Sequence, residues 1–332
     1  MNIFVSIPLG ENRDTFLTEE NVAFLESLGT LTWNNTEEFL DAEKMRDALE
    51  NVDILVCGWG TPKLTEEVLS KANRLKLVAY VAGSVANVVS EAMYNRGIRI
   101  VCGNEAFARS VAEASLAYML CALRDIPYYN NRMQKGLWKA EVSHGRALND
   151  QTVGIIGYGA ISKYLLDLLR PFNVKILLYS GHMTQEQAES LGVQKASLEE
   201  IFSTCKVVSV HSARSAKNYH MINEQLLRMM KEDAVLVNTA RGDIIDEEAL
   251  IRVAREGKIR AILDVFEEEP LPLNSGLRGM ENVILLPHCG GPTIDKRCDA
   301  ARLVLDDILR LQRNEPLQNE IVAARAATMS NT

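Results

Sequence analysis

The chain has 332 residues, of which 47% are hydrophobic and 24% charged, and its formal net charge is −8. This length predicts about two domains of a globular protein. The negative balance argues against nucleic acid as a partner, because phosphate backbones are bound by clustered Lys and Arg. The N-terminal apolar run is too short for a signal peptide. No run approaches the roughly 18 apolar residues of a membrane span, so we expect a cytoplasmic protein with no membrane partner.

The six cysteines are scattered along the chain, and none belongs to a CxxC pair or to a His/Cys cluster with zinc spacing. This pattern favours free thiols in a reducing compartment and predicts no metal site. Cys289 lies beside His288 and could be a nucleophile, but we expect it to pack as a small buried residue.

Strand-like and helix-like segments alternate along the chain, which predicts an α/β fold with parallel sheets and helices on both faces. The expected strands of the first part are Asn2–Ile7, Asp53–Cys57, Leu75–Val81 and Ile98–Val101. The expected helices between them are Glu37–Leu49, Thr65–Lys71 and Ser90–Asn95.

A second part begins with a long predicted helix, Ser110–Arg124, opened by a capping-box pattern at Ser110 and Glu113. Residues Asp125–Asp150 are rich in aromatics and lack a period, so we expect a long excursion. It either packs on a second subunit or lies on its own domain. The expected later strands are Val153–Ile156, Lys175–Tyr179, Val207–His211, Ala234–Asn238, Ala261–Val265 and Val283–Leu286. The expected helices are Ala160–Leu169, one capped by Ser197–Glu200, and Thr293–Gln312.

The segment Gly157-Tyr-Gly159-Ala-Ile-Ser162 lies between a predicted strand and a predicted helix, the context of a dinucleotide-binding loop. Gly157 would allow the tight turn, and Gly159 would let the backbone approach a pyrophosphate. The N–H groups of Ala160 and Ile161, at the helix N-terminus, would hold the anion. Ser162 replaces the usual third Gly or Ala. The alternative is a generic turn that needs glycine sterically.

The acid expected about 20 residues further on, which binds the ribose hydroxyls of NAD, is missing. The chain reads Leu178-Tyr179-Ser180-Gly181-His182 there, with no acid before Glu186. Ser180, Gly181 and His182 are candidate cofactor contacts that suit a hydroxyl or a phosphate, but no Arg is adjacent. We infer NAD or NADP, with relaxed choice or some use of NADPH. His182 could equally be a solvated loop histidine.

Three polar residues, Arg241, Glu269 and His288, each follow a predicted buried strand. In a parallel α/β sheet, ligands bind beyond the carboxyl ends of the strands, so the three side chains should converge. Each of the three residues also has an alternative interpretation. Arg241 could pair with a nearby Asp at a helix start, Glu267 or Glu268 could be the relevant acid, and His288 could be a core histidine.

Together these motifs resemble the D-isomer-specific 2-hydroxyacid dehydrogenases. The matching segments are Thr152–Ser162, Leu236–Leu250, Ile262–Pro272 and Leu286–Gly291. The resemblance implies a Rossmann-type, doubly wound dinucleotide domain at residues 102–291. It also implies a smaller, discontinuous, flavodoxin-like substrate domain made of residues 1–101 and 292–332. A homodimer built largely on the dinucleotide domain is implied as well.

By resemblance, Arg241 binds the substrate carboxylate, His288 is the acid/base and Glu269 pairs with His288. The loop Ala82-Gly83-Ser84 matches one whose backbone N–H groups help to hold that carboxylate, although it looks one residue shorter. Thr239 and Asp264 match positions near the nicotinamide and its ribose. The adenine-pocket segment, usually proline-containing, reads His211-Ser-Ala-Arg214-Ser. The remaining cofactor candidates are His211, Ser212, Asn218, Ala240, His288 and Gly290.

These residue types suit the reduction of a small 2-oxo acid, which needs a hydride at carbon and a proton at oxygen. Histidine suits the proton step, and a guanidinium can clamp and orient the carboxylate. Relatives that oxidise formate carry Gln before the proline, so Glu269 favours a hydroxy-acid couple. We expect an NAD(P)-dependent D-2-hydroxyacid dehydrogenase, similar to a glyoxylate or hydroxypyruvate reductase. The alternative is a dinucleotide-sensing dimeric protein of the corepressor type, which keeps the same residues.

Overall fold

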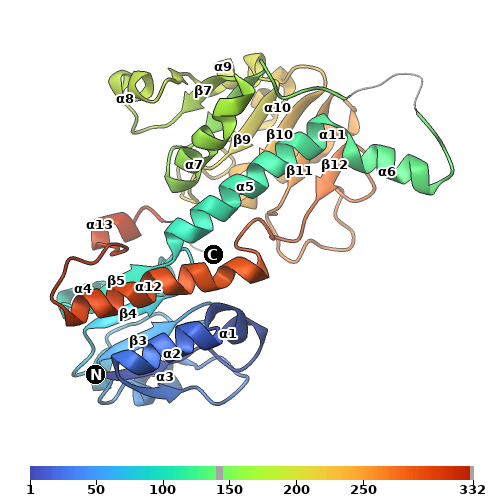
Figure 1. Ribbon diagram of the computed structural model, residues 1–332. Coiled ribbons are helices and arrows are strands. Elements are labelled where there is room, and N and C mark those ends of the chain that lie inside the picture. Colours follow the sequence, from blue (N-terminus) through green and yellow to red (C-terminus); the bar gives the residue numbers. More distant parts are fainter. Residues whose placement is uncertain (140–144, 330–332) are drawn as a thin grey trace. The chain divides into compact units, whose positions relative to one another are not determined.

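The computed structural model describes residues 1–139 and 145–329. The chain divides into two compact units, which Figure 1 shows. The first unit comprises Met1–Ala108 and Pro292–Thr332, and the second comprises Arg109–Gly291. Each unit contains one parallel sheet with helices, so the predicted α/β class is confirmed. The chain first passes between the units within a helix, after Ala108, whereas the sequence suggested a boundary after Val101.

The sheet of the first unit has five parallel strands in the order β2-β1-β3-β4-β5. This is the strand order of flavodoxin, as predicted. The strands are β1 (Asn2–Val5), β2 (Thr30–Trp33), β3 (Ile54–Cys57), β4 (Leu77–Tyr80) and β5 (Arg99–Cys102). All residues of β3 and β4 are buried, because helices cover both faces of a parallel sheet.

Most helices of the first unit are short, and α12 is its longest. They are α1 (Glu11–Phe16), α2 (Glu19–Leu28), α3 (Ala42–Ala48), η1 (Val68–Lys71), α4 (Glu91–Asn95), η4 (Ile294–Lys296), α12 (Arg297–Gln312) and α13 (Ala323–Ala326). The helix predicted to start at Glu37 begins five residues later, where Asp41 caps it through the Lys44 N–H. Helices α1 and α2 and strand β2 were not predicted.

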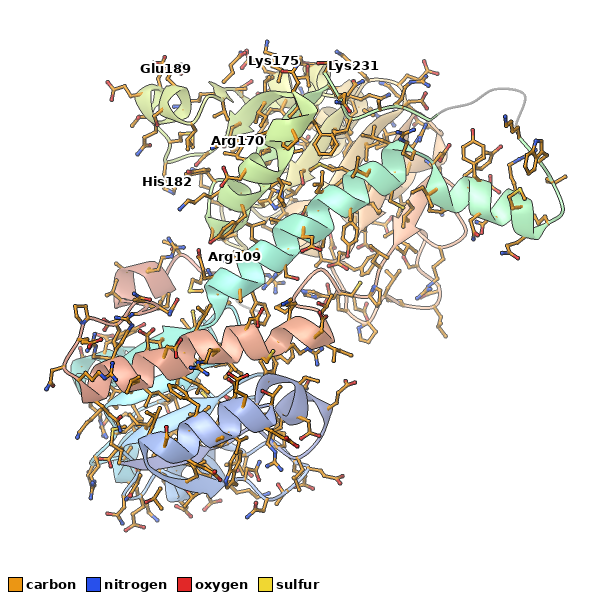
Figure 2. The ribbon with its side chains drawn as sticks, viewed as in Figure 1. Arg109, Arg170, Lys175, His182, Glu189 and Lys231 are labelled. Carbon is orange, nitrogen blue, oxygen red and sulfur yellow. The ribbon has the colours of Figure 1, made fainter. Side chains whose placement is uncertain are left out.

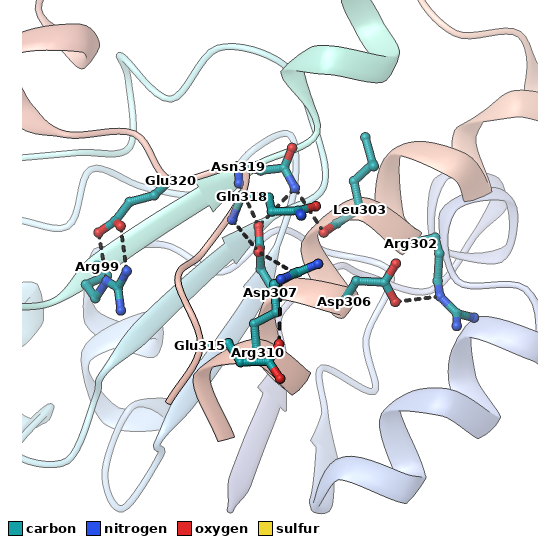
Figure 3. Close-up of polar contacts among 10 residues, drawn as sticks. All are labelled: Arg99, Arg302, Leu303, Asp306, Asp307, Arg310, Glu315, Gln318, Asn319 and Glu320. Carbon is teal, nitrogen blue, oxygen red and sulfur yellow. Dashed lines mark hydrogen bonds and ion pairs between the residues drawn. The ribbon is translucent and has the colours of Figure 1, made fainter. Parts of the chain in front are cut away.

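A buried aspartate fastens the C-terminal segment of the first unit to helix α12 (Figure 3). Asp307 is 1% exposed and accepts hydrogen bonds from the backbone N–H groups of Gln318, at 2.7 Å, and Asn319, at 2.9 Å. The Asn319 side chain donates a further bond at 2.9 Å. On strand β5, Arg99 holds the next residue, Glu320, through two hydrogen bonds of 2.7 and 2.5 Å. These contacts tie the chain after α12 to the sheet.

The replacement Asp307→Ala should destabilise the protein by about 2–4 kcal/mol, because the backbone N–H groups of Gln318 and Asn319 lose a buried, charged acceptor. Urea unfolding followed by circular dichroism measures the change. Asp306→Ala is the matched control, since Asp306 is a half-exposed neighbour that pairs with Arg302 at 2.9 Å. Its loss should cost less than about 1 kcal/mol. Equal effects of the two variants would contradict the role given to Asp307.

The sheet of the second unit has seven parallel strands in the order β12-β11-β10-β9-β6-β7-β8. The strands are β6 (Thr152–Ile156), β7 (Lys175–Tyr179), β8 (Gln194–Lys195), β9 (Val207–Val210), β10 (Ala234–Asn238), β11 (Ile259–Leu263) and β12 (Val283–Leu285). Strands β7 and β8 are added on one side of β6, and strands β9 to β12 are then added in order on its other side. The neighbouring strands β6 and β9 therefore form the topological switch point, where doubly wound folds bind dinucleotides.

The helices of the second unit flank this sheet (Figure 1). They are α5 (Asn104–Leu123), which begins in the first unit, α6 (Ile126–Gln134), α7 (Ala160–Leu169), η2 (Arg170–Phe172), α8 (Gln185–Ser190), α9 (Leu198–Thr204), α10 (Glu224–Met229), η3 (Gly242–Ile244) and α11 (Glu247–Arg255). The predicted capping box of α9 is confirmed, since Ser197 and Glu200 bond to each other's backbone N–H groups.

Helix α5 differs from the prediction at its start. It begins at Asn104 rather than at Ser110, so the predicted capping box of Ser110 and Glu113 is wrong. The Ser110 hydroxyl instead donates to the Gly291 carbonyl at 2.9 Å. By length and hydropathy alone α5 is long and apolar enough to cross a membrane, and a third of its most apolar stretch is buried within the protein. Its Met119 and Leu123 pack into the core of the second unit.

The predicted excursion at Asp125–Asp150 contains a helix that the sequence did not indicate. Helix α6 occupies Ile126–Gln134 and extends away from the sheet of its unit (Figure 1). No residue of α6 is buried, so the helix does not pack into the core of its unit. Residues 140–144, which include His144, lie outside the described residues.

Candidate active site

The glycine loop forms the turn between strand β6 and helix α7. Gly157 has φ 97°, and a Cβ there would lie 2.6 Å from the Ser212 backbone N, so the turn tolerates no side chain. Gly159 precedes α7 without any side-chain cap, and the space around its Cα is open. No N-cap side chain therefore covers the first N–H groups of α7, from Ala160 and Ile161, within the described residues. The Ser162 hydroxyl donates to the Gly157 carbonyl at 2.7 Å and steadies the loop. This geometry fits a pyrophosphate.

The segment after strand β9 lies against this glycine loop. His211 shares a 2.8 Å hydrogen bond between its Nε2 and the Ser209 hydroxyl, and burial lowers its pKa to about 4. Its buried Nδ1 has no partner among the described residues. Ser212 approaches the Ile156 carbonyl at 3.4 Å, and Asn218 donates to the Ala213 carbonyl at 2.8 Å. A neutral ring with an unpaired buried nitrogen fits the side of a cofactor site.

An open pocket of about 320 Å³ lies beyond the end of β7. Ser180 and His182, two of the predicted cofactor residues, line it together with Tyr158 from the glycine loop and residues of α8. The His182 N–H approaches the Ser180 hydroxyl at 3.5 Å. No carboxylate lines this pocket, in agreement with the acid missing from the sequence.

Arg241 lies just past the end of β10, on a loop shaped by a buried asparagine. The Asn238 side chain accepts from the Ala240 N–H at 3.0 Å and donates to the Arg241 carbonyl at 2.9 Å. The Arg241 Nη1 donates to the Ala240 carbonyl at 2.6 Å, whereas its Nε is buried without a partner among the described residues. Burial lowers the pKa of Arg241, and the charge of Glu269 opposes this shift. A buried guanidinium with a free donor suits a carboxylate ligand.

Glu269 and His288 lie within hydrogen-bond distance, with Glu269 Oε2 2.7 Å from His288 Nδ1. The other Glu269 oxygen accepts the Phe266 N–H at 3.0 Å. Both side chains remain partly exposed, Glu269 at 35% and His288 at 46%. Because Nδ1 faces the carboxylate, the His288 Nε2 is the nitrogen left for a substrate.

The neighbouring glutamate Glu267 makes a different pair. Its Oε1 lies 2.7 Å from the Nε2 of His220 and also accepts the Glu247 N–H at 3.1 Å. The alternative in which Glu267 serves His288 is therefore wrong. The structure assigns that contact to Glu269, the residue before Pro270.

A glycine sets the distance between the Arg241 loop and the Glu269 loop. A Cβ on Gly242 would overlap the backbone of Phe266 and Glu267, so the two loops touch through their main chains. Arg241 and Glu269 are thereby held on adjacent loops at the carboxyl edge of the sheet. Gly242 and Asn238 were not predicted as site residues, although each lies within three residues of Arg241.

Two further predicted cofactor residues make contacts inside the protein. Thr239 is buried, and its hydroxyl lies 3.1 Å from that of Ser115 on α5. Asp264 follows β11 and accepts the N–H groups of Cys289 and Gly290, each at 2.8 Å. Asp264 therefore anchors the loop that carries His288, which has φ 53°. Its place near a nicotinamide stays a prediction.

Cys289 is exposed, so the expectation that it packs as a buried residue is wrong. Its Sγ lies 3.7 Å from the Tyr118 hydroxyl, and partial desolvation of the sulfur raises the pKa of this thiol although the residue is exposed. A raised pKa disfavours the thiolate that nucleophilic chemistry requires. Within residues 1–139 and 145–329, no three His, Cys, Asp or Glu side chains gather as a metal site would require.

The loop Ala82-Gly83-Ser84 belongs to the first unit and follows strand β4. The Gly103 N–H donates to the Ala82 carbonyl at 3.0 Å. A Cβ on Gly83 would lie 3.2 Å from the Phe107 ring, which leaves little room for a side chain there. The Ser84 hydroxyl accepts the Ala86 N–H at 3.4 Å. The predicted substrate contact of this loop stays a prediction.

Comparison with known proteins identifies the family. The model of the D-isomer specific 2-hydroxyacid dehydrogenase NAD-binding domain matches residues 116–290, more than half of the chain. This chain belongs to the D-isomer-specific 2-hydroxyacid dehydrogenases. The predicted family, one of NAD-dependent oxidoreductases, is confirmed, and with it the dinucleotide-binding domain.

Individual members of the 2-hydroxyacid dehydrogenase family are similar over most of this chain. A glyoxylate reductase from Pyrococcus furiosus is 31% identical over 94% of this chain and 93% of its own length. A D-3-phosphoglycerate dehydrogenase from Methanocaldococcus jannaschii is 36% identical over 92% of this chain, which spans only 58% of that relative. The structure of a D-2-hydroxyisocaproate dehydrogenase has a TM-score of 0.81 at 26% identity, covering 97% of this chain and 99% of its own.

Proposed function

We propose that this protein is an NAD(P)-dependent D-2-hydroxyacid dehydrogenase that reduces a small 2-oxo acid or oxidises the D-hydroxy acid. The observation that carries this proposal is the Glu269–His288 hydrogen bond of 2.7 Å. This pair lies at the same carboxyl edge of the sheet as Arg241, whose buried Nε has no partner among the described residues. An acid/base histidine and an anion-binding guanidinium at the carboxyl edge of a Rossmann sheet suit an anionic carbonyl substrate.

In this proposal Arg241 binds the substrate carboxylate. Its buried Nε can donate to a carboxylate oxygen, and such a charge-assisted bond is worth roughly 1.5–3 kcal/mol. The planar guanidinium also sets the angle of the neighbouring carbonyl group. The backbone N–H groups of Ala82-Gly83-Ser84 in the first unit would hold the same carboxylate.

His288 exchanges the proton with the substrate oxygen through Nε2. Glu269 fixes the orientation of the ring through Nδ1 and favours the imidazolium, as the acid of a catalytic triad does. The dinucleotide supplies or accepts the hydride when bound. In the second unit, the dinucleotide would be held by the glycine loop, by the segment from His211 to Asn218 and by Ser180-Gly181-His182. Its nicotinamide would lie near Thr239, Ala240, Asp264 and Gly290. The first unit would then be the substrate domain.

The substrate class follows from the relatives. The names of similar proteins include glyoxylate reductase and D-3-phosphoglycerate dehydrogenase, so we propose a small 2-oxo acid of the glyoxylate and hydroxypyruvate type. The test is a panel of 2-oxo acids assayed with NADH and with NADPH, followed by absorbance of the reduced nicotinamide. Turnover of at least one acid, and oxidation of D- but not L-hydroxy acids, supports the proposal. Tight dinucleotide binding without any turnover would favour the corepressor-type alternative.

We also propose a homodimer formed through the surface around helix α6. This surface presents apolar side chains to solvent, with Ile126 54%, Met133 51%, Leu137 47% and Trp138 69% exposed. Clustered exposed apolar residues mark an association surface. Light scattering of the full chain should give about twice the 37.0 kDa of one copy, and a monomer mass would contradict the proposal.

A cytoplasmic location agrees with the six free cysteines.

A further inference from the structure

A lysine from another segment reaches the turn that follows strand β7. We propose that Lys217 makes this enzyme select NADPH over NADH by binding the 2′-phosphate of the adenosine ribose. The inference rests on the proposed function, because it concerns the dinucleotide that the second unit would hold. Nothing in the spacing of the sequence pointed to Lys217.

The ammonium group of Lys217 lies close to Gly181. A Cβ on Gly181 would lie 3.5 Å from the Lys217 Nζ, with no other non-neighbouring atom within 4 Å. The ammonium group therefore lies over the turn Ser180-Gly181-His182, and Gly181 leaves the space beside it open. Lys217 is exposed. Its neighbour Arg214 pairs with Asp243 at 2.7 Å, whereas Lys217 makes no ion pair within the described part of the chain.

This turn is the place where a Rossmann fold reads the 2′ position of the ribose. An acid at the end of the second strand bonds the 2′-hydroxyl of NAD, and a cation there accommodates the 2′-phosphate of NADP. The second strand of this unit is β7, and the pocket beyond it is lined by Ser180 and His182 but by no carboxylate. The repulsion that would exclude a phosphate is absent from this lining.

The chemistry of the two ligands explains the selection. A phosphate monoester carries about −1.5 to −2 charges near neutral pH and offers strong acceptor oxygens. The ammonium of Lys217 supplies three donors and a full positive charge. The Ser180 hydroxyl and the His182 ring, in the pocket wall, can donate further bonds. A 2′-hydroxyl gains no comparable attraction from a lysine and finds no carboxylate in this pocket to accept its hydrogen bond.

The experiment is equilibrium binding of NADPH and of NADH to the full chain, by titration calorimetry and by fluorescence of the bound nicotinamide. We expect NADPH to bind roughly 10-fold more tightly or better. Lys217→Gln should weaken NADPH binding by roughly 10-fold and change NADH binding less than about 2-fold. Ser180→Asp should restore the missing acid and reverse the preference. The advantage of NADPH should shrink as salt is raised, because the site is exposed.

Lys175→Gln is the matched control. It removes the same charge from the first residue of β7, whose five residues span roughly 13 Å. Figure 2 labels Lys175 and His182 at the two ends of this region. This variant should leave both dissociation constants unchanged.

Four results would overturn the inference. The first is NADH binding as tightly as NADPH to the unaltered enzyme. The second is a Lys217→Gln variant that weakens both dinucleotides equally or neither, as a merely solvated lysine would. If neither dinucleotide binds at all, the proposed function fails, and the inference fails with it. Selective NADH binding would overturn the inference alone and leave the proposed function intact.

Discussion

His288→Ala is expected to lower kcat for reduction of the best 2-oxo acid by roughly 10²- to 10⁴-fold, the usual contribution of a positioned acid/base group. The reason is that the His288 ring is the proton donor held by Glu269 at 2.7 Å. Dinucleotide affinity should change far less than kcat, because the glycine loop and the β7 turn keep their structure. Steady-state kinetics and titration of the dinucleotide measure both quantities.

The chain offers an internal control for this experiment. His220 and Glu267 form a second histidine–glutamate pair with the same 2.7 Å separation. His220→Ala should therefore leave kcat within about 3-fold of the unaltered enzyme. Glu269→Gln should lower kcat by roughly 10- to 100-fold, as the loss of an orienting partner usually does. An active His288→Ala enzyme, or equal losses in the two histidine variants, would contradict the assignment.

Arg241→Ala is expected to raise KM for the 2-oxo acid by roughly 10- to 100-fold, because one or two charge-assisted bonds to the carboxylate disappear. The value of kcat should fall as well, since the guanidinium orients the carbonyl that accepts the hydride. Folding should be little affected, because the buried Nε has no partner to lose within the described chain. Kinetics, inhibition by a non-reacting 2-oxo acid analogue and thermal unfolding separate these effects.

Two variants sharpen this test. Arg241→Lys keeps the charge but loses the planar donor pair, so it should recover only part of the activity. Arg252→Ala removes an arginine from the surface of α11, where it pairs with Glu224 at 2.8 Å, and should leave KM unchanged. An unaltered KM in the Arg241→Ala variant would contradict the proposal that Arg241 binds the substrate carboxylate.

Much of the second unit could be predicted because its central strands are buried on both faces. Such strands appear in a sequence as continuous apolar runs. Strands β7 and β10 and helix α7 were predicted with their observed bounds. The unpredicted strands lie at sheet edges: β2 alternates between exposed and partly buried residues, and β8 has two exposed residues. An edge strand needs little apolar surface, so its sequence carries a weak signal.

Among the site residues, too, some could be predicted from the sequence and others could not. Arg241, Glu269 and His288 could be proposed from their positions after apolar strands, because parallel strands end at one edge of a sheet. The motif before Pro270 favoured Glu269, but Glu267 and Glu268 stayed open as alternatives because the three consecutive acids share one context. Their side chains point in different directions from a loop, and only the folded loop places Glu269 against His288.

The sequence by itself determined the two α/β sheets, the glycine turn and the family, since each depends on residues close together in the chain. The tertiary structure alone decided which groups from distant segments meet. It brought Ser110 to Gly291 rather than to a helix cap, Gly242 to the backbone of Phe266, and Lys217 to the turn at Gly181. Local patterns report whether a residue is buried and in which element it lies. Contacts between segments depend on how the helices and strands pack, which no local pattern encodes.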